Sequence, residues 1–255
     1  MLGFSATPGV EFLPSDDTRA WVADGLRDHA ARLGSAAVEP RVITKAAIEK
    51  PHDLDDLFEL MCGVQSQVGQ AEVEFSLVEM DPDDPPSKHG FAPLGDPNGQ
   101  LLHTFAKRDE LVVVVVPALF RVPELTLASV ARELGRISIH RAGGHQVEAD
   151  DFEGDAELAA VALGLGVWVA NGAYIYESAC CGGGCGLDLS SLRAGLSMPE
   201  ACFALAVDSQ RKGLTRRTVA KFLESTQRAA FKRSWGYVRQ QPALAAAPTV
   251  AALGS

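Results

Sequence analysis

Hydrophobic and polar positions recur along this chain with two periods, which together predict a mainly helical protein with a small sheet. Ser15–Asp17 is the expected N-cap of a first helix, because Ser and Asp side chains accept hydrogen bonds from a helix's first amides. Apolar residues then recur at helical spacing up to Gly34. A second, shorter helix is expected to begin after Pro51 and to run through Met61.

Two segments in the middle of the chain have the pattern of strands. Apolar and polar residues alternate over Ala71–Met80, which predicts a half-exposed strand. Leu111–Val116 is an unbroken β-branched run, typical of a strand buried on both faces. Between them, Asp81–His89 is acidic and rich in proline, and we interpret it as a solvated connection rather than a ligand cluster.

A helix is expected over Glu124–His140, which we call the motif helix. Its apolar stripe comprises Leu127, Val130, Ala131, Leu134 and Ile137. Ser129, Arg132, Arg136 and His140 fall on the opposite side, with Glu133 at the boundary. The glycines after Arg141 end the helix.

The longest apolar segment, Leu158–Tyr176, has Asn171 as its only strongly polar residue and approaches membrane-spanning length. It is rich in Ala and Gly and lacks a basic flank, so we expect a buried central helix, with a membrane span as the alternative. Two further helices are expected over 198–212 and 216–240.

These elements predict an α+β fold in one compact unit. We expect an N-terminal helical segment over 1–70 and a mainly helical domain with a small sheet over 71–240. The Ala- and Pro-rich remainder, 241–255, lacks aromatic residues and is expected to be disordered.

Charge and cysteine content narrow the classes of partner and compartment. The formal net charge of -10 argues against nucleic acid as a partner, because phosphate binding needs a positive surface. The basic stretch 211–233 is interpreted as the solvated face of a C-terminal helix. Five unevenly spaced cysteines and an N-terminus without the pattern of a signal peptide favour a soluble cytoplasmic protein, with no membrane association.

The most informative chemistry lies in the motif helix, which reads Arg132-Glu133-Leu134-Gly135-Arg136. The string is similar to the HExxH motif, in which two histidines on one helical face bind zinc and the glutamate activates the bound water. Arginine stands here at both histidine positions, and a guanidinium group has no lone pair for a metal.

The chain from Leu111 to Gln240 resembles the zincin-fold metallopeptidases, in particular a bacterial group related to the gluzincin branch. The resemblance rests on the buried strand before the motif helix, on the motif itself and on the acid-tipped helix start Glu153–Glu157 that follows. It implies that Glu153 and Glu157 occupy the positions of a third ligand and a supporting acid, and which carboxylate has which role stays open. An alternative interpretation, independent of the family, is that Arg132 and Arg136 belong to a solvated helix face.

The resemblance implies a catalytically inactive protein. Arginines at the ligand positions can form paired hydrogen bonds to Glu133, Glu153 or Glu157 and so supply positive charge without a metal. We therefore expect a pseudo-metallopeptidase without a cofactor, which acts as a structural, binding or regulatory protein. The partner is expected to be a protein or a small molecule, bound in a pocket lined by Arg132, Glu133, Arg136 and Glu153.

Two other functions stay open. Glu133 could act as the general base of a metal-independent enzyme in which Arg132 and Arg136 bind an anionic substrate, although flanking arginines weaken a carboxylate as a base. Alternatively, the chain could bind a metal through one of two sets of residues: His140 and His145, or Cys180, Cys181 and Cys185.

Overall fold

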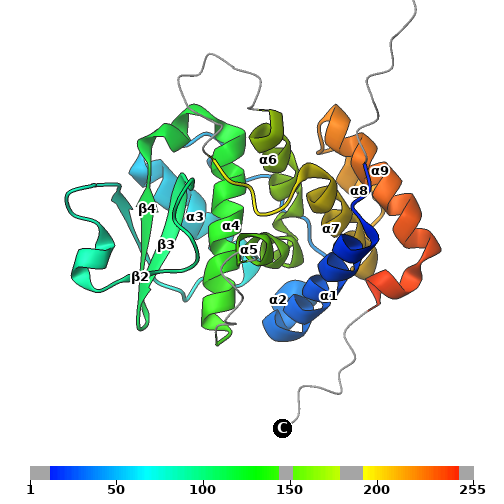
Figure 1. Cartoon of the computed structure of the whole chain (residues 1–255), viewed down its shortest axis with the longest axis horizontal. Coiled ribbons are helices and arrows are strands. Elements are labelled where there is room, and N and C mark those ends of the chain that lie inside the picture. The colour runs from blue at the N-terminus through cyan, green and yellow to red at the C-terminus, as the bar shows by residue number, and fades with distance from the viewer. Residues whose placement is uncertain (1–11, 144–151, 179–191, 247–255) are drawn as a thin grey trace, which may run out of the picture.

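The computed structural model describes residues 12–143, 152–178 and 192–246, with the side chains of 176–178 excepted. Its fold is α+β, as predicted, with a small sheet to one side of a larger group of helices (Figure 1). One hydrophobic core contains side chains from both the N-terminal helices and the central ones, including Leu26, Leu57, Leu134 and Leu158.

The N-terminal helices begin where the sequence predicts. Helix α1 spans Asp16–Leu33, and the hydroxyl of Ser15 caps it by accepting from the Thr18 amide at 3.2 Å. Helix α3 spans Leu54–Val68, beyond the predicted end, and the Asp53 carboxylate accepts from the Asp56 amide at 2.9 Å. A short helix, α2 (Ser35–Val38), lies between them in the chain.

Within the described residues, the sheet has four strands in the order β1-β4-β3-β2. The apolar run forms β4 (Glu110–Val115), which pairs in parallel with β1 (Ser76–Glu79) and antiparallel with β3 (Leu102–Lys107). At the far edge, β2 (Ala92–Pro93) pairs antiparallel with β3. The sequence pattern does not predict β2 and β3.

The strand predicted over Ala71–Met80 is shorter than expected. Pairing with β4 begins only at Ser76, opposite Val112. Upstream, the side-chain amide of Gln65 on α3 donates to the Val73 carbonyl at 3.1 Å, so this carbonyl is bonded to a helix instead of a strand. The loop after β1 contains a 3-10 helix, η1 (Pro86–His89), and a second one, η2 (Pro117–Arg121), follows β4.

The motif helix is α4 (Pro123–Arg141), and it lies between the sheet and the helices α5 and α6, which are described below (Figure 1). It packs against β3, α5 and α6. Every residue from Ala128 to Ile139 is buried. The interpretation of Arg132 and Arg136 as a solvated face is therefore wrong, because this helix has neighbours on both sides.

The long apolar segment is not one continuous helix. It comprises α5 (Phe152–Ala160), a π-helical turn η3 (Val161–Leu165) and α6 (Gly166–Ser178). The break lies at Gly164, whose φ of 96° is outside the helical region. The Gly164 carbonyl instead accepts from the Ile43 amide at 2.9 Å.

Phe152–Ile175 is long and apolar enough to cross a membrane by length and composition, but 83% of its most apolar window is buried inside the protein. Helices buried to this extent are typical of the core of a globular protein, so the segment is compatible with a soluble protein.

Three helices complete the C-terminal part. Helix α7 (Met198–Arg211) starts with a capping box formed by Ser197 and Glu200. The predicted helix over 216–240 is interrupted and consists of α8 (Arg216–Ala220) and α9 (Ser225–Gln240). The chain turns between them because Leu223 is buried in the core and Asn171 donates to the Phe222 carbonyl at 3.2 Å.

Regular structure continues beyond Gln241, where the sequence predicts the start of a disordered tail. Pro242–Ala245 forms a 3-10 helix, η6, and Leu244 and Ala245 pack against the core. Within the predicted basic face, Arg216, Arg217, Lys221, Arg228, Lys232 and Arg233 are exposed. Arg211 and Lys212 differ, because their side chains pair with Asp208.

Candidate functional site

Helices α4 and α5 bring together all five residues that the sequence analysis assigned to one site. Arg132, Glu133 and Arg136 come from α4, and Glu153 and Glu157 come from α5. We call these five residues the arginine–glutamate cluster.

Gly135 allows the two helices to approach each other this closely. A Cβ atom at this position would lie 2.0 Å from the carbonyl oxygen of Ala156 on α5, which is far inside van der Waals contact. With no side chain at Gly135, the arginines on the same helix reach the carboxylates of α5 directly.

Arg136 joins both acids that flank it in space. Its two terminal nitrogens donate to the two carboxylate oxygens of Glu153, at 2.9 and 2.6 Å, in a bidentate pair. Its Nε donates to Oε2 of Glu133 at 3.1 Å, and Nη1 also donates to the Leu94 carbonyl. The Arg136 side chain is 0% exposed, so these hydrogen bonds are shielded from solvent.

Arg132 connects α4 to Glu157 through one carboxylate oxygen. Its Nε donates to Oε1 of Glu157 at 2.8 Å, and its Nη1 donates to the Gln100 side chain and to the Arg193 carbonyl. Glu157 in turn accepts from the amides of Gly195 and Leu196, at 3.2 and 2.7 Å. The cluster thus also holds the segment that precedes α7.

Glu133 links the cluster to the sheet. Its Oε2 accepts from the amide and the hydroxyl of Thr104 on β3, at 2.8 and 2.7 Å, in addition to Nε of Arg136. Its Oε1 is buried without a hydrogen-bond partner. Both oxygens are enclosed by protein, since the side chain is 0% exposed.

The electrostatics of the cluster favour ionised arginines. Burial by itself lowers the pKa of Arg136, but the neighbouring carboxylates of Glu133 and Glu153 outweigh it and hold the pKa above its ordinary value. Two guanidinium groups face three carboxylates, so the arginines offset part of the negative charge of these buried acids, and backbone amides and the Thr104 hydroxyl donate further hydrogen bonds to them.

Within the described part of the chain, the side chains of the cluster are largely enclosed. Glu153 is its most accessible member, with 12% of the side chain exposed, against 5% for Glu157 and 1% or less for the two arginines. A ligand would have to displace internal ion pairs to reach these groups.

One further polar residue near the cluster escaped the sequence analysis. His103 on β3 is 3% exposed, and both of its ring nitrogens lack a hydrogen-bond partner. Burial, with the positive charges of Arg136 and Arg132, lowers the pKa of His103 to about 3, although Glu153 and Asp96 act in the opposite direction. Its neighbour along the strand, Thr104, bonds to Glu133, but nothing in the sequence relates either residue to the motif helix.

The residues of the alternative metal site are described only in part. His140 is half-buried near the end of α4. His145, Cys180, Cys181 and Cys185 lie outside the described residues. Over 12–143, 152–178 and 192–246, no group of three or more His, Cys, Asp or Glu side chains is placed to hold a metal ion.

The chain was also compared with known proteins. No protein-family model, no curated protein and no solved structure matches it.

Proposed function

We propose that this chain is a catalytically inactive, zincin-like protein in which the arginine–glutamate cluster replaces a zinc site. In this proposal the protein is cytoplasmic and acts as a structural, binding or regulatory component. The observation that carries it is the pairing of Arg132 with Glu157 and of Arg136 with Glu153, at the two positions where histidine ligands would stand.

The chemistry of the cluster fits a structural role. A zinc ion cross-links helices through its ligands, and the two guanidinium groups make the same kind of connection between α4 and α5 by hydrogen bonds. A guanidinium group offers neither a coordination position nor a lone pair, so it cannot activate water as zinc does.

The geometry weighs against Glu133 as a general base. A base must reach the proton that it removes, directly or through one water. Oε2 of Glu133 already accepts three hydrogen bonds, and the side chain is fully buried. The partner in our proposal therefore binds elsewhere on the protein.

A double substitution tests the family assignment behind this proposal. In Arg132→His/Arg136→His, two imidazoles stand beside Glu153 and Glu157, which recreates a ligand set for zinc. We expect this variant to bind one zinc ion per chain, measured by competition with a coloured chelator. Arg132→Gln/Arg136→Gln is the matched control, because it removes the same two charges without adding ligands.

Adding Glu153→Gln or Glu157→Gln to the histidine variant identifies the third ligand, because only one of them should abolish binding. If the histidine variant is unfolded alone, recovery of its helical circular dichroism on addition of zinc is an equivalent result. Equal zinc affinity of the histidine and glutamine variants would contradict the proposed relationship.

A further inference from the structure

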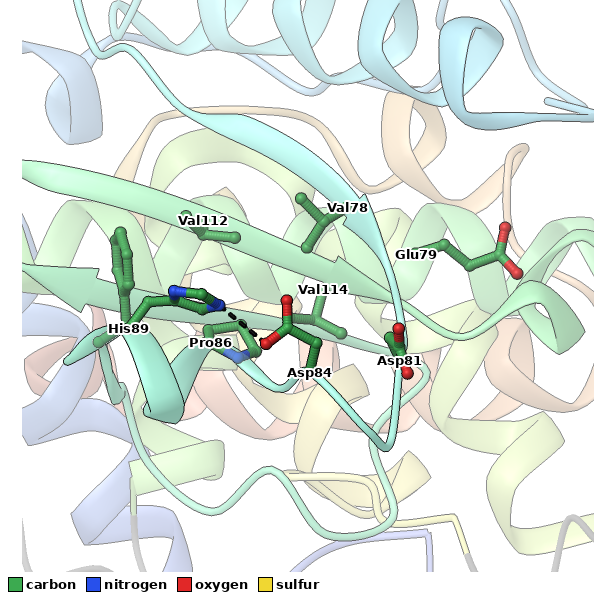
Figure 2. A pocket seen from close by; sticks show the side chains of 9 residues that line it. Val78, Glu79, Asp81, Asp84, Pro86, His89, Val112 and Val114 are labelled. Carbon is green, nitrogen blue, oxygen red and sulfur yellow. Dashed lines mark hydrogen bonds and ion pairs between the residues drawn. The ribbon is translucent and has the colours of Figure 1, made fainter.

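The free edge of the sheet is accompanied by a groove on one sheet face. Strand β1 is an edge strand, and no described strand pairs with its other side. Beside it lies a pocket of about 310 Å³ between the sheet and the loop that follows β1 (Figure 2). We call this pocket the β1 groove, and the residues that line it are Val78, Glu79, Asp81, Asp84, Pro86, His89, Phe91, Val112 and Val114.

The floor of the groove is apolar and comes from two paired strands. Val78 of β1 pairs in register with Val114 of β4, and Val112 lies two residues earlier on the same face. Figure 2 shows these three valines behind the loop. Val78 is 37% exposed and Met80, the residue after β1, is 42% exposed, so apolar surface is accessible at this edge.

The rim of the groove is negatively charged. Asp81 and Asp84 contribute two carboxylates, and no Lys or Arg lines the groove. The Glu79 side chain follows Val78 in the strand and therefore points to the other face of the sheet. Figure 2 shows Glu79 and Asp81 near one end and His89 towards the other, with Asp84 between them and bonded to His89 at 2.9 Å. Two lysine side chains lie near the loop. Lys88 donates to the Asp83 carbonyl and Lys107 donates to the His89 carbonyl, so both ammonium groups bond to the loop backbone.

The edge of β1 adds backbone groups to this surface. The Met80 amide donates to the Val115 carbonyl at 2.8 Å, towards β4. Alternate residues of a strand direct their N–H and C=O groups to opposite edges, so those of Leu77 and Glu79 point away from β4. Such unpaired groups are a template for an added strand.

We propose that the β1 groove binds an extended peptide segment of a partner protein in which an apolar residue is followed, two residues further along, by a Lys or Arg on the same face of the strand. The segment adds to β1 as a fifth strand, with its apolar side chain beside Val78 and its cationic side chain directed to Asp81 and Asp84. We infer a cationic peptide because its charge complements the carboxylates of Asp81 and Asp84. We infer an extended backbone because the free edge of β1 can pair with an added strand. This site shares no residue with the arginine–glutamate cluster, so it does not depend on the inactive-enzyme proposal.

The test measures binding of the fluorescein-labelled peptide Thr-Val-Thr-Lys-Thr-Lys, called the Val-Lys peptide, to the full chain by anisotropy at low salt. As a strand this peptide directs its Val and both Lys side chains to one face. We expect saturable binding that Asp81→Asn/Asp84→Asn weakens by about tenfold or more, since charge-assisted contacts are lost. Asparagine keeps the acceptor oxygens that bond to the Asp83 amide and to His89. Asp17→Asn/Asp28→Asn on α1 is the matched control, with the same change of charge, and should change the affinity by less than about twofold.

Two further probes separate a strand from a simple cation. A peptide N-methylated at alternate amides should bind much more weakly, because it cannot complete the backbone ladder, and hexylamine should not compete at ~1 mM. No binding of the Val-Lys peptide up to ~1 mM would overturn the proposal. Equal weakening by both double variants, equal binding of the N-methylated peptide, or displacement by hexylamine would each overturn it as well.

Discussion

At the scale of single residues, Arg136 is the connection on which most of the cluster depends. It bonds to Glu133 on its own helix and to Glu153 on α5, and its side chain is 0% exposed. Removing one partner of such a network leaves the others buried with uncompensated charge, which costs far more than the loss of an exposed ion pair.

We predict that Arg136→Met destabilises the fold by about 3–5 kcal/mol, measured by urea denaturation. The control is Arg27→Met, which removes an exposed pair with Asp24 on α1 and should cost no more than about 1 kcal/mol. In Arg136→Met/Glu153→Gln, part of the loss should be recovered because one unpaired charge is gone as well. Similar costs for the two single variants would show that the cluster contributes little.

His103 makes the stability depend on pH in a defined direction. Its pKa is about 3 in the folded protein and near its ordinary value of 6.5 in the unfolded chain. Between these values the unfolded state binds more protons, so stability is complete above pH 6.5 and is lost as the pH falls towards 3.

We predict that this residue lowers the unfolding free energy by ~2 kcal/mol between pH 7.5 and pH 5. His103→Phe should therefore reduce the difference between the two pH values by this amount, measured by urea denaturation at each pH. His52→Phe, at an exposed position, should leave the difference unchanged. An unchanged pH dependence in His103→Phe would show that the imidazole titrates normally in the fold.

The sequence indicates the residues of the cluster through the resemblance of Arg132-Glu133-Leu134-Gly135-Arg136 to a zinc-binding motif. The opposite charges of the two arginines and of the acids downstream then suggest the pairing, although charge alone left a solvated helix face as the alternative. The roles of Thr104, Gln100 and His103 could not be predicted, because their contacts with the cluster depend on how β3 and its preceding segment lie against α4.

At the scale of elements, the contact between α4 and α5 decides whether the cluster can form. Gly135 permits this contact, because any side chain there would overlap the Ala156 carbonyl. The interhelical distance and the ion pairs are therefore coupled: helices that move apart by the size of a methyl group no longer hold both arginines in paired geometry.

We predict that Gly135→Ala destabilises the protein by about 3 kcal/mol or more, measured by thermal or urea denaturation, or prevents soluble expression. Gly63→Ala on α3 is the control, because no atom lies within 4 Å of its added Cβ. It should stabilise the fold by about 0.5–1 kcal/mol, since alanine favours a helix. Tolerance of Gly135→Ala would contradict the close packing of α4 on α5.

The sequence predicts elements well where one period dominates over their whole length. The unbroken apolar run of β4 and the amphipathic start of α1 belong to this group. It predicts them poorly where a tertiary contact decides. At Gly164, where the helix breaks, the carbonyl accepts a hydrogen bond from the Ile43 amide. Before β1, the Val73 carbonyl accepts one from the Gln65 side chain, so it is bonded to a helix and not to a strand.

At the scale of the whole molecule, the cluster lies where the small sheet, α4 and α5 meet. Glu133 bonds to β3, Arg132 and Arg136 bond to α5, and Glu157 bonds to the segment before α7. Four segments of the chain, β3, α4, α5 and the residues before α7, are thereby joined through one set of buried charges. A zinc ion in such a position would stabilise a fold in the same way, with the difference that a chelator could remove it.

The central claim, that this junction is held by arginine and not by a metal, is tested most directly by the zinc content of the purified full chain. Expression in zinc-supplemented medium, followed by mass spectrometry of the metals, should give far less than one zinc atom per chain. The unfolding temperature should also be unaffected by EDTA. One tightly bound zinc atom per chain, with a lower unfolding temperature after its removal by EDTA, would contradict this account.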